Sequence, residues 1–285
     1  MTTIPLSPSA RTRATALAGP AAPEARAFED PASRRPGSGW RGFGTQLRCV
    51  FWKLLTNPFS LGFSIGLPIF MYLMFGAGQS YSDQWTGHAN VAASVLVNMA
   101  VYGTIMTASS MGANVALERT SGISRLQALT PMSPLAYVSA RICASALITI
   151  VVTSIVYAVG RFTGARMDAS AWAGSFAMMV VVSVLPIALG LAAAFAVRSD
   201  GVFALTSAIT VIGSFAAGMF IPLEQMGSFW ARIAPYSPFY GLVKLVQAPL
   251  YGWDGLHWEW LANHLVWTAL FALVAVSAQR RGTGR

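Results

Sequence analysis

Six stretches of the chain are long, apolar and nearly free of charge, and polar segments separate them. Each has about the 20 residues that an α-helix needs to cross about 30 Å of hydrocarbon. The stretches are too long for barrel strands of about 10 residues and show no in/out alternation. The pattern predicts an all-α membrane protein with six transmembrane helices within residues 58–280. They lie near Pro58 to Gly76, Val91 to Gly112, Leu135 to Gly160, Trp172 to Val197, Val202 to Ile221 and Trp260 to Ala278.

The composition supports a membrane protein, because 55% of the 285 residues are hydrophobic and only 10% are charged. Soluble domains carry about 25% charged residues. Short cytoplasmic loops retain Lys and Arg, so the distribution of these residues predicts the orientation. With both termini in the cytoplasm, all but four of the 19 Lys and Arg residues lie on the cytoplasmic side. The four exceptions are Arg161, Arg166, Arg232 and Lys244.

The cytoplasmic set comprises Arg11, Arg13, Arg26, Arg34, Arg35, Arg41, Arg48, Lys53, Arg119, Arg125, Arg141, Arg198, Arg280, Arg281 and Arg285. This asymmetry predicts a multi-pass protein of the cell membrane. It also assigns the net charge of +9 to topology and to contact with anionic membrane lipids, and no nucleic-acid partner is expected.

The chain begins with a segment, residues 1–39, that is rich in Ala, Pro, Ser, Thr and Arg. It has no apolar run of the 7 to 15 residues that a signal peptide requires, so we expect a disordered cytoplasmic tail. Residues 281–285 form a second short tail. Between residues 40 and 57, apolar residues at helical spacing accompany Arg48 and Lys53, which predicts an amphipathic helix in the inner interface. The alternative is a cytosolic extension of the first span; the Asn57-Pro58 pair favours a break.

The segment after the fifth apolar stretch, residues 222–259, is too long for a turn. Its many aromatic residues, four prolines and few charges suit short helices that dip into the outer interface, where Trp and Tyr side chains are favourable. The alternative is a loop that an aromatic belt anchors.

A charged segment, residues 118–134, separates the second and third stretches. Glu118 and Arg119 end the second stretch, and Gly122 permits a turn. Apolar residues then recur close to once per helical turn until Pro131 ends the pattern, which predicts a short cytoplasmic helix. Ser133 and Pro134 are typical of the cap and the first position of the next helix. The apolar stripe of the short helix indicates a soluble partner; it consists of Ile123, Leu126 and Leu129.

Several kinds of chemistry are missing from the sequence. There is no G-x-x-x-x-G-K-[ST] phosphate loop, so the chain does not hydrolyse ATP by that route. Metal-ligand pairs of recognisable spacing are also missing, so we expect no metal site and no enzyme activity. The spans hold almost no charged residues, which argues against an ion-coupled transporter. If the chain is a transporter, the energy must then come from elsewhere.

The segment "ERTSGISRLQALTPMSPLAYVSARI", residues 118–142, resembles the signature E-R-x-x-G-x-x-x-x-L-x-x-[ST]-P-[ML]-[ST] of ATP-binding cassette (ABC) permeases of the type-2 class. Members include drug-resistance and antibiotic exporters and exporters of lipids or polysaccharides. Residues 216–252 are similar to the family's stretch from the fifth span into an outer re-entrant helical hairpin. The resemblance covers residues 40–280 or so.

The resemblance implies that residues 123–132 form a coupling helix, which docks on a separate ATPase subunit. Two copies of that ATPase would bind ATP and Mg²⁺, so this chain needs no cofactor. Glu118 would face the amphipathic entry helix, where Arg48 or Lys53 can pair with it. The alternative is that Glu118 only ends a span. The residues expected to couple the chain to the ATPase are Glu118, Arg119, Gly122, Ile123, Arg125, Leu126, Leu129 and Pro131.

The resemblance also implies that the second and fifth spans line a path between two permease copies, either two of this chain or this chain and a related one. Such a path is weakly polar and suits an amphipathic or hydrophobic drug, antibiotic or lipid, which predicts efflux. The path residues expected are Asn98, Tyr102, Thr206, Thr210 and Ser214, with Phe215 and Met219, accompanied by Phe220, as an outer hydrophobic plug. One alternative is that the hydroxyl residues only pack helices. Another is a membrane-anchored sensory subunit that docks a cytoplasmic regulator and transports nothing.

Overall fold

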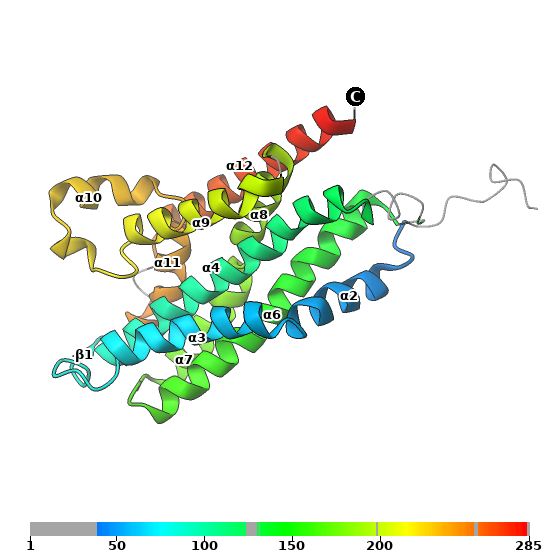
Figure 1. Cartoon of the computed structure of the whole chain (residues 1–285). Coiled ribbons are helices and arrows are strands. Elements are labelled where there is room, and N and C mark those ends of the chain that lie inside the picture. The colour runs from blue at the N-terminus through cyan, green and yellow to red at the C-terminus, as the bar shows by residue number, and fades with distance from the viewer. Residues whose placement is uncertain (1–38, 124–129, 131, 198, 254–255, 284–285) are drawn as a thin grey trace, which may run out of the picture. The chain divides into compact units, whose positions relative to one another are not determined.

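The computed structural model describes residues 39–123, 130, 132–197, 199–253 and 256–283, which belong to one compact unit, Gly39–Arg285 (Figure 1). The predicted tail, residues 1–39, lies outside the described residues apart from Gly39. The unit is a bundle of long helices, with short helices and a small hairpin gathered at one end (Figure 1).

The first two described helices are α2 (Phe43–Leu55) and α3 (Pro58–Phe75). They are separated at Thr56 and Asn57, where the Thr56 amide donates to the Trp52 carbonyl and ends α2. The predicted break at Asn57-Pro58 is therefore confirmed. Helix α2 packs along α6 (Pro134–Phe162). Its place in a membrane interface stays a prediction.

Helix α4 (Val91–Thr120) is the centre of the bundle and contacts α3, α6, α8 (Val184–Ala196) and α9 (Ser199–Ala216). It continues eight residues beyond the predicted end at Gly112, so Glu118 and Arg119 lie on its last turns. The predicted start of α6 is confirmed, because the Ser133 side chain accepts a hydrogen bond from the Ala136 amide and Pro134 takes a first-turn position.

The predicted fourth span is two helices in the structure, α7 (Ala169–Val182) and α8, which meet at Ser183. Proline has no amide hydrogen, so Pro186 cannot complete the hydrogen bond that would continue the ladder across the junction. The last helix is α12 (Trp258–Thr283), which packs against α8.

Among the described residues, four helical segments are long and apolar enough to cross a membrane: Val91–Thr120, Leu135–Phe162, Ala169–Ala196 and Trp258–Ala278. Two shorter apolar helices, Gly62–Phe75 and Gly201–Ala216, coincide with the first and fifth predicted spans. The structure agrees with a helical membrane protein. That all six segments span the membrane stays a prediction.

The end of the bundle at the start of α4 contains a hairpin that the sequence did not predict. Its strands, β1 (Trp85–Thr86) and β2 (Ala89–Asn90), are antiparallel. The buried Asn90 caps α4, because its side-chain oxygen accepts hydrogen bonds from the amides of Ala93 and Arg166. Its amide donates to the Gly164 carbonyl, so one side chain ties the hairpin to the loop before α7.

Residues 222–259 contain short helices, as expected; their re-entry into a membrane stays a prediction. They are η2 (Leu223–Gln225), α10 (Ser228–Ile233), η3 (Ala234–Tyr236), α11 (Tyr240–Gln247) and η4 (Ala248–Leu250). Six of the eight residues of α11 are buried, and this helix packs against α4, α7 and α12.

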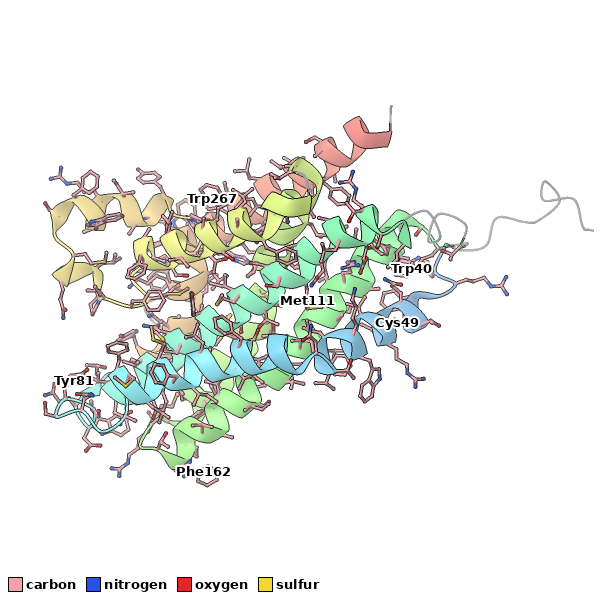
Figure 2. All side chains as sticks on the ribbon, in the orientation of Figure 1. Trp40, Cys49, Tyr81, Met111, Phe162 and Trp267 are labelled. Carbon is pink, nitrogen blue, oxygen red and sulfur yellow. The ribbon has the colours of Figure 1, made fainter. Side chains whose placement is uncertain are left out.

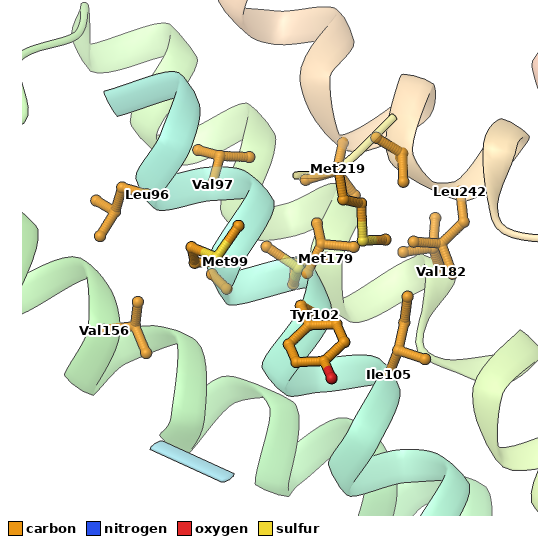
Figure 3. Close-up of a cluster of buried hydrophobic side chains, with 14 of the residues drawn as sticks. Leu96, Val97, Met99, Tyr102, Ile105, Val156, Met179, Val182, Met219 and Leu242 are labelled. Carbon is orange, nitrogen blue, oxygen red and sulfur yellow. The ribbon is translucent and has the colours of Figure 1, made fainter. Parts of the chain in front are cut away.

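The core around the first half of α4 is filled by apolar side chains from several helices. In Figure 3, Leu96 and Val156 face each other between α4 and α6, while Met179 and Leu242 bring in α7 and α11. Further along, Gly112 of α4 and Gly190 of α8 lie in direct backbone contact. The two helices therefore cross with no side chain between them at this point.

Candidate functional site

An ion cluster lies at the end of α4 that adjoins the predicted coupling segment. The buried Glu118 carboxylate accepts hydrogen bonds from the Arg141 guanidinium and, at 3.0 Å, from the Tyr137 hydroxyl. Its other oxygen lies 3.4 Å from the Lys53 ammonium. Because Lys53 is on α2 and both Tyr137 and Arg141 are on α6, one carboxylate joins three helices.

Arg141 is the most deeply buried member of this ion cluster, with 1% of its surface exposed. It donates to the Met111 carbonyl of α4 at 3.1 Å, and its guanidinium lies 4.8 Å from the centre of the Tyr137 ring. Met111 is labelled in Figure 2, in the part of α4 that faces this arginine. Sequence analysis counted Arg141 among the cytoplasmic charges; the structure places it about two turns inside α6. The nearby carboxylate of Glu118 offsets the cost of burying the Arg141 charge.

Arg119, the residue after Glu118, points to a different neighbour. It donates to the Ala194 carbonyl at the end of α8 at 3.1 Å, and it lies 5.1 Å from the centre of the Phe195 ring. The last carbonyls of a helix lack partners within the helix and favour positive charge. The Glu118-Arg119 pair therefore connects α4 to α2 and α6 on one side and to α8 on the other.

The two ends of the predicted coupling segment adjoin α4 and α6, the helices that carry Glu118 and Arg141. Gly122 has a φ of 76°, a left-handed conformation that glycine adopts without strain, and it turns the chain directly after α4. At the other end, the Ser133 amide donates to the Gly39 carbonyl at 2.8 Å, just before α6 begins. Ile123 is exposed. The other predicted coupling residues lie outside the described residues; they are Arg125, Leu126, Leu129 and Pro131.

Of the two predicted partners of Glu118 on the entry helix, the structure brings only Lys53 to it. Arg48 is exposed and contacts no carboxylate in the described part of the chain. Sequence reasoning missed Arg141 and Tyr137. A lone arginine inside an apolar span is itself a signal of function, and a tyrosine four residues earlier on the same helix lies on the same face.

Replacing Lys53 with Gln is expected to lower the free energy of unfolding by less than about 1 kcal/mol, as for exposed ion pairs. The Lys53 side chain is 62% exposed, and Glu118 keeps its contacts with Arg141 and Tyr137. Thermal denaturation in detergent measures the change, and Arg48→Gln is the matched control on the same helix, with no expected effect. A loss of several kcal/mol in Lys53→Gln would contradict the inference that Arg141, and not Lys53, is the main charge partner of Glu118.

At the other end of α4, four of the predicted path residues converge. The Asn98 amide donates to the Met219 carbonyl at 3.2 Å. The Tyr102 ring centre lies 5.1 Å from that of Phe220, which lies 4.7 Å from that of Phe215.

One residue of this outer cluster, Gln247, was not predicted. The Gln247 amide of α11 donates to the Asn98 side-chain oxygen at 2.6 Å. The structure thus joins α4, the end of α9 and α11 through one amide pair and one aromatic group.

The three hydroxyl residues predicted on the fifth span, Thr206, Thr210 and Ser214, are all buried within the chain. Thr206 donates to the Val202 carbonyl one turn earlier on α9. The exposed side of α9 is mainly apolar; besides Ser207 it carries Leu205, Val211, Ile212 and Phe215. A path role for the three hydroxyls stays a prediction.

A half-exposed polar stripe lies instead along α4, where Asn98, Met106, Ser110 and Asn114 recur on one face. Each interval of four residues places a side chain about one turn above the last, so Met106, Ser110 and Asn114 follow one another along the helix and the row winds gradually from Asn98. This stripe is the more polar of the two open surfaces that α4 and α9 present.

Comparison with known proteins agrees with this architecture. The sequence profile described as "ABC-2 family transporter protein" matches residues 79–278, well over half of the chain. The matched region begins just before the hairpin at the start of α4 and ends within α12, so it includes the ion cluster except for Lys53. No curated protein matches the chain. From the family match, we conclude that the chain is a membrane transport protein that belongs to the ABC-2 family of transporters.

Proposed function

We propose that this chain is the membrane subunit of an ATP-driven exporter that moves an amphipathic or hydrophobic substrate, such as a drug, an antibiotic or a lipid, outward. A separate ATPase, present in two copies, drives two permease copies through residues 118–134. ATP and Mg²⁺ belong to the ATPase. The observation that carries the proposal is the Glu118 ion cluster, which joins α4 to α2 and α6 beside that segment.

The cluster suits the transmission of movement because the segment continues into both of the helices that Glu118 connects. A push on the segment acts on α4 through Gly122 and on α6 through Ser133. The buried contact between Glu118 and Arg141 then holds these two helix ends together, so they move as one body. Arg119 extends the same connection to the end of α8.

The open surface of α4 supports the substrate class. Its half-exposed stripe has two amides, one hydroxyl and one thioether, and it has no charged side chain before Glu118. Amide and hydroxyl groups can bind a polar group of a substrate while the apolar side of α9 accommodates its hydrophobic part. The contact of Phe215 with Phe220 near the end of α9 supports an outer hydrophobic plug against leakage.

Replacing Glu118 with Gln is expected to reduce substrate-stimulated ATP hydrolysis by about tenfold, equivalent to about 1.4 kcal/mol. The ATPase remains bound, because the docking surface is unchanged. Leu126→Asp, within the docking segment itself, is expected to reduce hydrolysis at least as much. The measurement is phosphate release by the purified complex in proteoliposomes, together with extrusion of the amphipathic dye rhodamine 6G.

The matched control is Asp83→Asn, which removes an exposed carboxylate beyond the opposite end of α4. If the complex forms and both Glu118→Gln and Leu126→Asp hydrolyse ATP and extrude dye at the wild-type rate, the coupling role is wrong. If instead the wild-type complex moves no amphiphile, while the ATPase changes activity when the permease binds, the sensory function is the better description.

A further inference from the structure

A second polar site lies between α11 and the start of α12, apart from the ion cluster. It is a cavity of about 220 Å³ lined by Lys244, Gln247, Tyr251, Gly252, His257 and Trp260. One wall of the cavity comes from the buried end of α11 and η4, and the other comes from the more exposed residues at the start of α12.

The chemistry of this cavity suits an anion. Lys244 is half-buried, and its ammonium lies 5.9 Å from the centre of the Tyr240 ring. In the described part of the chain, no carboxylate lies within ion-pair distance of it. Every polar side chain in the lining can donate a hydrogen bond, and none is acidic. A half-buried cation that has no carboxylate partner among the described residues, and that is surrounded by donors, favours a negatively charged occupant.

The size of the cavity limits the part of a ligand that can enter. Sites for drug-sized molecules measure about 300–1,000 Å³, so about 220 Å³ suits a small charged group such as a phosphate. The tyrosine and tryptophan in the lining are typical of the level of lipid headgroups. Beyond the cavity, α12 presents the exposed side chains of Leu261 and Leu265, against which acyl chains can pack.

We propose that this cavity binds the phosphate group of an anionic amphiphile, with Lys244 as the charge partner and Tyr251, His257 and Trp260 as hydrogen-bond donors. Gln247 lines the cavity and also donates to Asn98 of α4. The occupant is therefore one side chain away from the central helix. This site does not depend on the direction of transport or on the identity of the ATPase.

The test is the binding of phosphatidylglycerol to the full chain in a neutral detergent, with phosphatidylcholine as the uncharged reference. Phosphatidylglycerol is expected to raise the melting temperature of the wild-type protein in a saturable way, whereas phosphatidylcholine does not. Lys244→Gln is expected to weaken the apparent affinity about tenfold, because a charge-assisted hydrogen bond is lost. Lys244→Arg keeps the charge and should retain affinity within about threefold.

The matched control is Arg232→Gln, which removes an equal charge from the exposed α10 on the same predicted side of the membrane. Tyr251→Phe is a second, milder variant, which removes one hydroxyl and is expected to weaken binding about threefold. A titration with inorganic phosphate distinguishes the sources of the ligand. Stabilisation by free phosphate that requires Lys244 identifies a soluble anion, and stabilisation only by phosphatidylglycerol identifies a lipid.

Two results would overturn the proposal. One is equal weakening by Lys244→Gln and Arg232→Gln, which would mean that overall surface charge attracts the lipid. The other is unchanged affinity in Lys244→Gln and Lys244→Arg. Asp254 lies outside the described residues, so the variant Asp254→Asn is tested beside Lys244→Gln to learn whether this carboxylate is the partner of Lys244. If Asp254→Asn and Lys244→Gln lower the lipid-free melting temperature equally and neither changes the affinity, Lys244 serves only that carboxylate.

Discussion

Gly112→Val is expected to reduce the yield of folded chain at least tenfold. A Cβ at Gly112 would lie 2.6 Å from the Ile187 carbonyl oxygen and 2.6 Å from the Leu191 amide nitrogen, both backbone atoms of α8. Backbone atoms in a packed helix cannot move aside as a flexible side chain can, so α4 and α8 must separate. Overpacking of a core typically costs about 1–3 kcal/mol, and this site lies at the upper end or beyond.

The measurement is the monodisperse peak in size-exclusion chromatography of detergent extracts. Gly66→Val is the matched control, because Gly66 is exposed within α3 and a Cβ added there would meet no atom within 4 Å. It carries the same change of residue type in a helix, so propensity costs are comparable. Gly190→Val should resemble Gly112→Val, since its Cβ would meet the Ala113 amide nitrogen at 2.9 Å. Normal yield of both would show that the crossing is not tight.

Small residues around both glycines gave a sequence signal for close helix packing, but that signal could not name the partner. Ala113 follows Gly112, and Ala192 to Ala194 follow Gly190. Gly and Ala are enriched wherever membrane helices approach closely. Which two stretches meet depends on the packing of the whole bundle, and neither stretch contains information on the other.

Helix ends were predictable where the residues that cause them are local. Ser133-Pro134 starts α6, Asn57-Pro58 separates α2 from α3, and Gly122 turns the chain after α4. The end of α9 was predicted five residues late, at Ile221 rather than Ala216. The apolar run continues past the helix, because the residues beyond it are also buried.

The end of α9 is fixed by a glycine whose role the apolar run concealed. Gly218 has a φ of 74°, its amide donates to the Phe215 carbonyl, and the Met219 amide donates to the Ser214 carbonyl. This pair of hydrogen bonds is the Schellman arrangement that ends many helices. It turns Met219 and Phe220 back toward α4, which is how the outer cluster with Asn98 and Tyr102 forms.

The ion cluster was half predictable for a similar reason. The resemblance implied that Glu118 faces the entry helix and pairs with Arg48 or Lys53, and the structure selects Lys53. Arg141 was assigned to the cytoplasmic side because Lys and Arg near span ends usually lie in loops. Arg141 is buried because folding brings it to the Glu118 carboxylate, 23 residues away in the sequence. A pattern of neighbouring residues does not predict a contact between positions so far apart.

Arg141→Met is expected to lower the free energy of unfolding by about 3–5 kcal/mol, the usual cost of removing one partner of a buried ion pair. The substitution removes the bond to the Met111 carbonyl and leaves the Glu118 carboxylate with Tyr137 and the mostly exposed Lys53. For a chain of this size, that corresponds to a fall in melting temperature of roughly 6–12 °C. Arg161→Met, near the exposed end of the same helix, is the matched control and should change the melting temperature little.

The double variant Glu118→Gln with Arg141→Met separates the ion pair from a simple loss of packing. Methionine fills much of the volume of the arginine stem, and glutamine keeps the acceptor for the Tyr137 hydroxyl without a buried charge. Since replacing both partners of a buried pair is often nearly neutral, the double variant should recover about 2 kcal/mol or more relative to Arg141→Met alone. Additive losses would mean that the two side chains act independently and that Glu118 does not tie α4 to α6.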